Sequence, residues 1–165
     1  MPSSYSFDVV SEFDQQELVN AIDQLRREVD QRYDLKDSKT KIDIKEDELS
    51  IVSLSDMTIE SVKDILLQKA TKRNLSLKIF DFQKIETIGG NMVMQIVKLK
   101  KGLSQEISKK LSKLVRDNMK KVTASIQGDS LRITGKNKDD LQAAINLIKK
   151  QEEELDIALQ FQNYR

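Results

Sequence analysis

Basic side chains recur at helical spacing in the second half of this chain, in a pattern suited to binding phosphate. The stretch from residue 98 to residue 121 holds nine lysine or arginine residues and two acidic residues. The members at helical spacing, or one turn beyond, are Lys109, Lys113, Arg116 and Lys120. Phosphate contacts need cations presented together on one face. The pattern makes this helix the best candidate for phosphate binding, although exposed lysines more commonly form a solvated face that serves solubility.

The two halves of the chain carry opposite net charge. Residues 1–83 have 12 basic and 17 acidic side chains, a net of −5, whereas residues 84–165 have 16 basic and 10 acidic side chains, a net of +6. The whole chain is close to neutral, at +1. Such asymmetry predicts an anionic partner for the second half.

Catalytic chemistry has few residues to work with in this sequence. The chain contains no cysteine and no histidine, which removes thiolate chemistry, the commonest general base and the commonest transition-metal ligand. Gly89-Gly90 lacks the spacing and the following helix of a phosphate loop. The acidic runs 46–48 and 152–154 cannot turn consecutive side chains toward one ion. We expect no enzymatic activity, no catalytic or metal-binding residues and no cofactor.

Nothing in the sequence predicts a membrane segment. No apolar run approaches the ~18 residues that indicate a spanning helix. The N-terminal residues MPSSYSFD lack the charged and then apolar pattern of a signal peptide. We therefore expect a soluble, cytoplasmic protein without a membrane partner.

The chain repeats itself at an offset of 82 residues. Residues 40–79 and residues 122–161 share one pattern of apolar positions without a gap, as in the pair Leu49 and Leu131. Two copies of one fold look like this after their surfaces have diverged. The offset is longer than a solenoid repeat, so the repeating unit is a small domain.

Both copies have the same expected order of elements, because alternating residues predict strands and apolar residues at helical spacing predict helices. In the first copy we expect strands at 5–10, 40–44, 49–53 and 75–79, a helix capped by Asp14 and a helix opened by Thr58. In the second copy we expect strands at 92–99, 122–126, 131–133 and 159–161 and helices capped by Ser104 and Asn137. The order β-α-β-β-α-β predicts an α+β fold with two ferredoxin-like domains, each an antiparallel four-stranded sheet with both helices on one face.

The face of each sheet away from its helices is a second candidate surface. In the second copy we expect Arg132 and Tyr164 on that face, among polar side chains. RNA-recognition modules of this architecture stack bases on aromatic residues of central strands. The third strands, at 49–54 and 131–134, contain no aromatic residue. Base stacking on the sheet is therefore not expected, and backbone or shape recognition stays open.

Several segments of the chain resemble the YajQ family of small bacterial proteins. They are Ser6-Phe7-Asp8-Val9-Val10-Ser11-Glu12, Arg32-Tyr33-Asp34, Ile126-Gln127-Gly128-Asp129, Thr134-Gly135-Lys136, Asp139-Asp140-Leu141-Gln142 and Leu159-Gln160-Phe161-Gln162-Asn163-Tyr164-Arg165. Members of that family carry two ferredoxin-like folds in tandem, so the resemblance implies the same fold here. The chain departs from the pattern at Leu35-Lys36-Asp37, where the family has an aromatic residue followed by Lys-Gly.

The resemblance implies further properties that the residue patterns do not supply. In this family the two domains exchange their N-terminal strands. Carried over, one domain spans residues 13–100 with strand 92–99 in its sheet, and the other combines residues 1–12 with residues 101–165. Family members bind RNA, purine nucleotides or cyclic di-GMP, and no enzymatic activity is established for them. The match at Arg32 and Tyr33 makes both ligand candidates, although a cation at a helix end also has a purely structural role.

These observations favour a non-enzymatic nucleotide-binding protein whose ligand is a purine nucleotide, cyclic di-GMP or RNA. Such a protein can act as a regulatory effector on another macromolecule. The candidate binding residues are Lys109, Lys113, Arg116, Lys120, Arg132, Arg32 and Tyr33. The site stays open between the basic helix, an open sheet face and a cleft between the domains. The alternative function is a protein–protein interaction adaptor without a nucleotide ligand.

Overall fold

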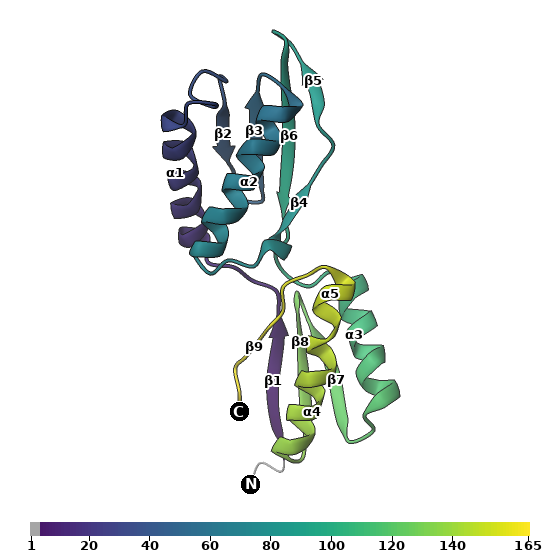
Figure 1. The fold of residues 1–165 in the computed structure, drawn as a ribbon. Coiled ribbons are helices and arrows are strands. Elements are labelled where there is room, and N and C mark those ends of the chain that lie inside the picture. The colour runs from purple at the N-terminus through teal and green to yellow at the C-terminus, as the bar shows by residue number, and fades with distance from the viewer. Residues whose placement is uncertain (1–3) are drawn as a thin grey trace. The chain divides into compact units, whose positions relative to one another are not determined.

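The computed structural model describes residues 4–165, which form two compact units, each with its own sheet and helices (Figure 1). The first, here called the split unit, combines the described residues up to Glu12 with Lys101–Arg165. The second, here called the continuous unit, spans Phe13–Lys100. The predicted α+β class with two ferredoxin-like domains is confirmed.

The split unit contains the first strand of the chain and all elements after residue 101. In chain order they are β1 (Tyr5–Val10), α3 (Gln105–Asn118), β7 (Val122–Gln127), β8 (Ser130–Gly135), α4 (Lys138–Lys149), α5 (Gln151–Leu155) and β9 (Gln160–Gln162). The sheet has the order β7-β8-β1-β9, and every neighbouring pair is antiparallel. This is the ferredoxin-like order, in which β1 occupies the interior of the sheet.

The core of the split unit lies between one face of this sheet and the helices. Strand β1 contributes Phe7 and Val9, and α3 contributes Leu111 and Val115. Alternation along a strand places i and i+2 on one face, and a period of 3.6 places i and i+4 on one side of a helix. The remaining members of the core are Leu103, Val122, Leu131, Ile133, Leu141, Ala144, Ile148, Ile157 and Leu159. Full burial of a large apolar side chain stabilises the fold by about 1.5–3 kcal/mol, so β1 is a major part of this core.

The continuous unit contains the elements between the first strand and residue 100. They are α1 (Gln15–Gln31), β2 (Lys41–Ile44), β3 (Glu48–Ser53), α2 (Asp56–Lys72), the 3₁₀ helix η1 (Leu77–Ile79), β4 (Phe80–Phe82), β5 (Glu86–Ile88) and β6 (Met92–Leu99). The sheet has the order β2-β3-β6-β4, and β5 also pairs with β6. Strand β6 therefore has the same interior position here that β1 has in the split unit.

The helices begin at short polar residues that accept hydrogen bonds from the first turn. Asp14, Ser104 and Asn137 cap α1, α3 and α4, as predicted. The prediction for α2 is wrong, because Ser55 is its cap and Thr58 lies three residues into the helix. The Thr58 N–H donates to Ser55 Oγ at 3.2 Å, and the Ser55 N–H donates to Thr58 Oγ1 at 3.1 Å. These reciprocal bonds form a capping box.

The repeat at an offset of 82 holds through β3 and β8 but fails at the last strand of the first copy. The bounds of β3 and β8 differ by that offset at both ends. The predicted strand at 75–79 is wrong, since Leu77–Ile79 forms a 3₁₀ helix and the strand is Phe80–Phe82. Leu77 is exposed, whereas the consecutive residues Ile79 and Phe80 are both buried. Burial of two consecutive residues is not the alternation that defines a half-buried strand.

Strands β1 and β6 have equivalent neighbours in their sheets. Strand β1 pairs with β8 and β9, and β6 pairs with β3 and β4. Each therefore lies between the strand that precedes and the strand that follows the second long helix of its own unit. That the two domains exchanged these strands stays a prediction.

The sheet faces away from the helices differ between the two units. In the split unit, the residues that alternate with the core are mostly polar and include Asp8 and Arg132, and the buried Val10 is an apolar exception. In the continuous unit, Val52 lies opposite Met94 across β3 and β6, and both are half-buried with Ile96. The first face is suited to hydrogen bonding and the second to apolar contact.

We predict that a fragment of residues 101–165 does not fold alone, because it lacks the strand between β8 and β9. Circular dichroism during urea titration should show no cooperative transition. Addition of a peptide of residues 4–12 should restore one, because Phe7 and Val9 complete the core. A matched peptide with Phe7→Asp and Val9→Asp is the control and should restore nothing. Cooperative unfolding of the fragment without any peptide would contradict this role of β1.

Candidate functional site

The outward side of α3 carries cations that no carboxylate neutralises. Lys109, Lys113 and Arg116 are exposed. Within residues 4–165 none of their side chains forms a hydrogen bond or an ion pair, unlike Lys110, whose Nζ lies 3.4 Å from a carboxylate oxygen of Glu106. Free cations on one helix side can contact consecutive phosphates without first breaking an internal bond.

Helix α3 holds this orientation because its opposite side is apolar. Leu111 and Val115 are buried in the core, so residues about half a turn away face solvent. Lys120 is also exposed, but it does not extend the helix face, since α3 ends at Asn118 and Met119 is its C-cap. Lys120 instead lies in the turn before β7.

Arg132 is bound to an internal carboxylate. Its Nε donates a hydrogen bond to Asp8 Oδ1 at 3.0 Å, and Asn163 Nδ2 donates to Asp8 Oδ2 at 2.9 Å. Asp8 is buried, and the Arg132 guanidinium holds the pKa of its carboxyl below the ordinary value. The three side chains join β1, β8 and the end of β9, so Arg132 is first a structural residue.

Tyr164 does not lie on the open sheet face, and this prediction is wrong. Asn163 adopts a left-handed backbone with φ of 57°. The chain continues along β1 beyond it with one extra residue, because Gln162 pairs with Asp8 whereas Arg165 pairs with Ser6. A shift of the register by one residue moves a side chain to the other face of the sheet. The Tyr164 ring centroid lies 6.0 Å from that of Phe7, a core residue on the helix side of the sheet. The ring is therefore presented beside the helices.

Arg32 and Tyr33 begin the loop between α1 and β2, and they differ in availability. Arg32 donates two hydrogen bonds to Asp34, at 3.0 and 2.8 Å, and these lower the pKa of that carboxyl. Tyr33 is 89% exposed, and Lys36 Nζ lies 5.4 Å from its ring centroid. Leu35, where the chain departs from the family pattern, is buried. The departure at Leu35 therefore changes the core, whereas the departure at Asp37 is exposed on the loop, and Tyr33 is free to contact a ligand.

Hydroxyl groups anchor the far end of this loop. Ser38 Oγ donates to the Leu35 carbonyl at 2.6 Å and lies 2.6 Å from Thr40 Oγ1. Thr40 Oγ1 lies 2.9 Å from Ser53 Oγ, which in turn lies 2.6 Å from Thr58 Oγ1. The chain of hydroxyls links the loop to β3 and to the start of α2. A satisfied buried network of this kind restricts the loop to one conformation.

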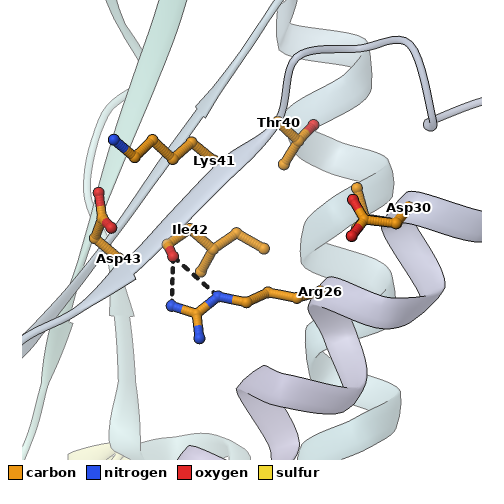
Figure 2. Close-up of a pocket in the computed structure, with 7 residues that line it drawn as sticks. Arg26, Asp30, Thr40, Lys41, Ile42 and Asp43 are labelled. Atoms are coloured by element: carbon orange, nitrogen blue, oxygen red, sulfur yellow. Dashed lines mark hydrogen bonds between the residues drawn. The ribbon is translucent and has the colours of Figure 1, made fainter.

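A cavity of about 320 Å³ lies between α1 and β2 in the continuous unit. Figure 2 shows Arg26 reaching across it, where Nε and Nη2 donate to the Ile42 carbonyl at 3.2 and 2.6 Å. Its other charged lining residues are Asp30, Lys41 and Asp43. Arg26 is committed to the strand, and the lining charges balance, so the cavity has little preference for an anion. The sequence carries no signal for it, because the partner of Arg26 is a backbone carbonyl.

A family model described as nucleotide-binding protein YajQ-like matches residues 5–165. The chain belongs to the YajQ-like family. It is 99% identical to a nucleotide-binding protein of Prochlorococcus marinus (strain NATL2A) and 70% identical to one of Synechococcus sp. (strain CC9605). It is 57% identical to one of Synechococcus sp. (strain JA-3-3Ab), and each of these matches covers 100% of both chains. The resemblance inferred from the sequence segments is confirmed.

The charge asymmetry of the two sequence halves does not carry over to the two units of this YajQ-like chain. The split unit has 13 basic and 11 acidic side chains, a net of +2, and the continuous unit has 15 and 16, a net of −1. The balance changes because Asp8 and Glu12 belong to the split unit, whereas Lys84, Glu86, Lys98 and Lys100 belong to the continuous unit. The positive charge that matters is therefore local, on the outward side of α3.

The part of this YajQ-like chain that the structure describes offers neither a metal site nor a membrane-spanning helix. Within residues 4–165, no three acidic side chains come together in a way that could hold a metal ion. Among the helices that the structure describes, none has the length and apolar character needed to cross a bilayer.

We predict that Asp8→Asn lowers the free energy of unfolding by about 1–2 kcal/mol at neutral pH, because it weakens charge-assisted hydrogen bonds. The folded-state pKa of Asp8 lies below its ordinary value of 3.8. Its contribution is therefore present above that value and is lost as the pH falls through the folded-state pKa. Urea unfolding should show wild type and variant converging below about pH 4. Asp117→Asn, an exposed control on α3, should change stability by less than about 0.5 kcal/mol. If the free energy of unfolding of Asp8→Asn were lower than that of the wild type by the same amount at all pH values, the role of the charge would be contradicted.

Proposed function

We propose that this chain is a non-enzymatic nucleotide-binding protein whose ligand is a purine nucleotide, cyclic di-GMP or RNA. The observation that carries the proposal is that relatives between 57% and 99% identical over their full length are named nucleotide-binding proteins. Identity at this level implies the same fold and many of the same surface side chains. A shared ligand class follows from shared surface chemistry.

The outward side of α3 supports a contact with phosphate groups. Its free cations are Lys109, Lys113 and Arg116, with Lys120 in the turn that follows the helix. Arg32 and Arg132 would have to give up hydrogen bonds to carboxylates before they could bind a ligand. Phosphate binding at α3 therefore costs less than binding at either arginine.

Tyr33 supports a separate contact with a base of single-stranded RNA. Its exposed ring lies on the continuous unit, with the Lys36 ammonium nearby. Base stacking on an aromatic ring contributes about 1–3 kcal/mol per base, and a neighbouring cation favours the phosphate. This contact uses the loop and not the sheet.

We further propose that ligand binding is relayed to another macromolecule, so that the protein acts as a regulatory effector. The apolar patch of Val52, Met94 and Ile96 on the open face of the sheet in the continuous unit, beside polar residues such as Ser50 and Lys98, supports a protein contact. The same face favours the alternative function, an adaptor that binds protein without any nucleotide. Calorimetric titration with GMP, ATP, cyclic di-GMP and bulk transfer RNA separates the two, since an adaptor would bind none of them.

We predict that Lys113→Ala combined with Arg116→Ala weakens binding of single-stranded RNA and flattens its salt dependence. Each phosphate neutralised on a single strand contributes about 0.7 to the slope of log K against log salt. Loss of two contacts should therefore reduce the slope by about 1.4, measured by calorimetry between about 50 and 200 mM salt. The fold should persist, because exposed substitutions usually change stability by less than about 0.5 kcal/mol.

A matched control removes the same charge from the other long helix of the split unit. Lys149→Ala with Lys150→Ala should leave the slope unchanged, and Arg132→Ala tests the open sheet face separately. If Arg132→Ala weakens RNA binding and the double variant Lys113→Ala, Arg116→Ala does not, the phosphate contact lies on the sheet.

We predict no hydrolysis or phosphoryl transfer by the purified protein. The chain has no histidine and no cysteine, and it lacks a phosphate loop, so no group is placed to activate a nucleophile or to stabilise a leaving phosphate. GTP, ATP and cyclic di-GMP incubated with the protein should stay intact by chromatography. Turnover that disappears with a single substitution in this chain would contradict the prediction.

A further inference from the structure

A second cavity, of about 310 Å³, lies between the start of β1 and one side of α4, within the split unit. The residues that define its chemistry are Tyr5, Lys138, Leu141, Ile145, Tyr164 and Arg165. None of them belongs to the α3 surface, and none lines the cavity in Figure 2. The two cavities therefore differ in both place and lining.

Helix α4 supplies one wall of this cavity. Lys138, Leu141 and Ile145 follow at intervals of three and four residues, which places them on one side of the helix. Leu141 packs in the core, whereas Ile145 is half-buried and Lys138 is exposed. The wall is thus apolar toward the sheet and cationic at its outer end.

The two chain ends of the sheet supply the opposite wall. The extra residue at Asn163 brings Tyr164 beside Phe7, and the backbone of residue 165 continues to pair with β1. There the Arg165 N–H donates to the Ser6 carbonyl at 3.0 Å, and the Ser6 N–H donates to the Arg165 carbonyl at 3.2 Å. These backbone hydrogen bonds fix the chain on the C-terminal side of Tyr164 and so hold its ring in place.

The lining combines aromatic faces with cations. Tyr5 and Tyr164 are 39% and 63% exposed, and within residues 4–165 neither hydroxyl forms a hydrogen bond. Lys138 Nζ lies 5.3 Å from the Tyr5 ring centroid and has no carboxylate partner among the described residues. Arg165 lies on the same cavity. Exposed ring faces next to the free Lys138 ammonium suit a ligand that is planar at one end and anionic at the other.

We infer that this cavity binds a purine nucleoside monophosphate, with the base on Tyr164 and the phosphate toward Lys138. The inference rests on the proposed nucleotide binding and assigns that binding a site. Tyr164 is the more exposed ring and provides the stacking face, and Leu141 and Ile145 provide the apolar floor. The Lys138 ammonium, held over Tyr5, is the phosphate partner.

The size of the cavity selects a mononucleotide. Small-molecule sites generally occupy about 300–1,000 Å³. At about 310 Å³ this cavity lies at the lower end, which suits one base, one ribose and one phosphate. A cyclic dinucleotide is about twice that size, so it would leave half of its atoms outside the walls.

Fluorine NMR on the full chain tests this assignment directly. The chain has three tyrosines, so labelling with 3-fluorotyrosine gives three signals, which Tyr→Phe variants assign. Titration with GMP should shift the signals of Tyr5 and Tyr164. The signal of Tyr33, which lies in the continuous unit, should stay in place. A shift of the Tyr33 signal alone would place GMP at that loop and would contradict the cavity assignment.

Variants divide the site into its base and phosphate parts. Tyr164→Leu should lower the affinity for GMP and for guanosine alike, by about fivefold or more, because the ring stacks on the base that both ligands share. Lys138→Gln should lower the affinity for GMP by about two- to tenfold and leave the affinity for guanosine unchanged, because it removes a contact with the phosphate only. Lys136→Gln is the matched control, an exposed lysine two residues away, and should change neither.

The outcomes separate this inference from the proposed function. If GMP binds by calorimetry while the Tyr5 and Tyr164 signals stay unmoved, the nucleotide binds elsewhere and the cavity assignment is wrong. If Lys138→Gln weakens guanosine as much as GMP, the phosphate assignment is wrong. If GMP and the other nucleotides of the panel all fail to bind, the proposed function fails together with the inference.

Discussion

The interior position of β1 is the constraint on which the split unit depends. Strand β1 lies between β8 and β9, so its two faces serve two separate purposes. Phe7 and Val9 fill the core, while Asp8 lies on the opposite face and accepts hydrogen bonds from Arg132 and Asn163. A shift of the register by one residue would exchange these faces and bury a carboxylate in the core. The alternation of apolar and polar residues in β1 therefore specifies a single register.

The candidate binding surfaces depend on this arrangement to different degrees. The cavity beside α4 depends on it directly, because Asp8 holds the side chain of Asn163, and the extra residue at Asn163 places Tyr164. The cations of α3 depend only on the amphipathic character of one helix. A change that loosens β1 should thus affect base binding in the cavity before it affects phosphate binding at α3. The two surfaces can be varied independently, which is useful for separating their contributions.

Local patterns in the sequence determined most of the architecture. Helical and strand periodicities, short polar caps and the repeat at an offset of 82 residues indicated two ferredoxin-like domains. These signals depend only on neighbours a few residues away, so they can be recognised from the sequence alone. They failed at β4, where Ile79 and Phe80 are both buried and the strand begins later than alternation predicts. The free cations Lys109, Lys113 and Arg116 were also found, because helical spacing alone places them together.

Which charged and aromatic side chains are available to a ligand was decided only by the tertiary structure. Arg132 meets Asp8 across 124 positions of sequence, and no local pattern encodes that pairing. The net charges of the two sequence halves do not give the net charges of the two units, because β1 belongs to the split unit and β6 belongs to the continuous unit. Tyr164 changed faces because one residue, Asn163, adopts a left-handed backbone. Periodicity reports which side of an element is buried, but a binding site forms between elements, and their pairing is settled by the packing of the whole domain.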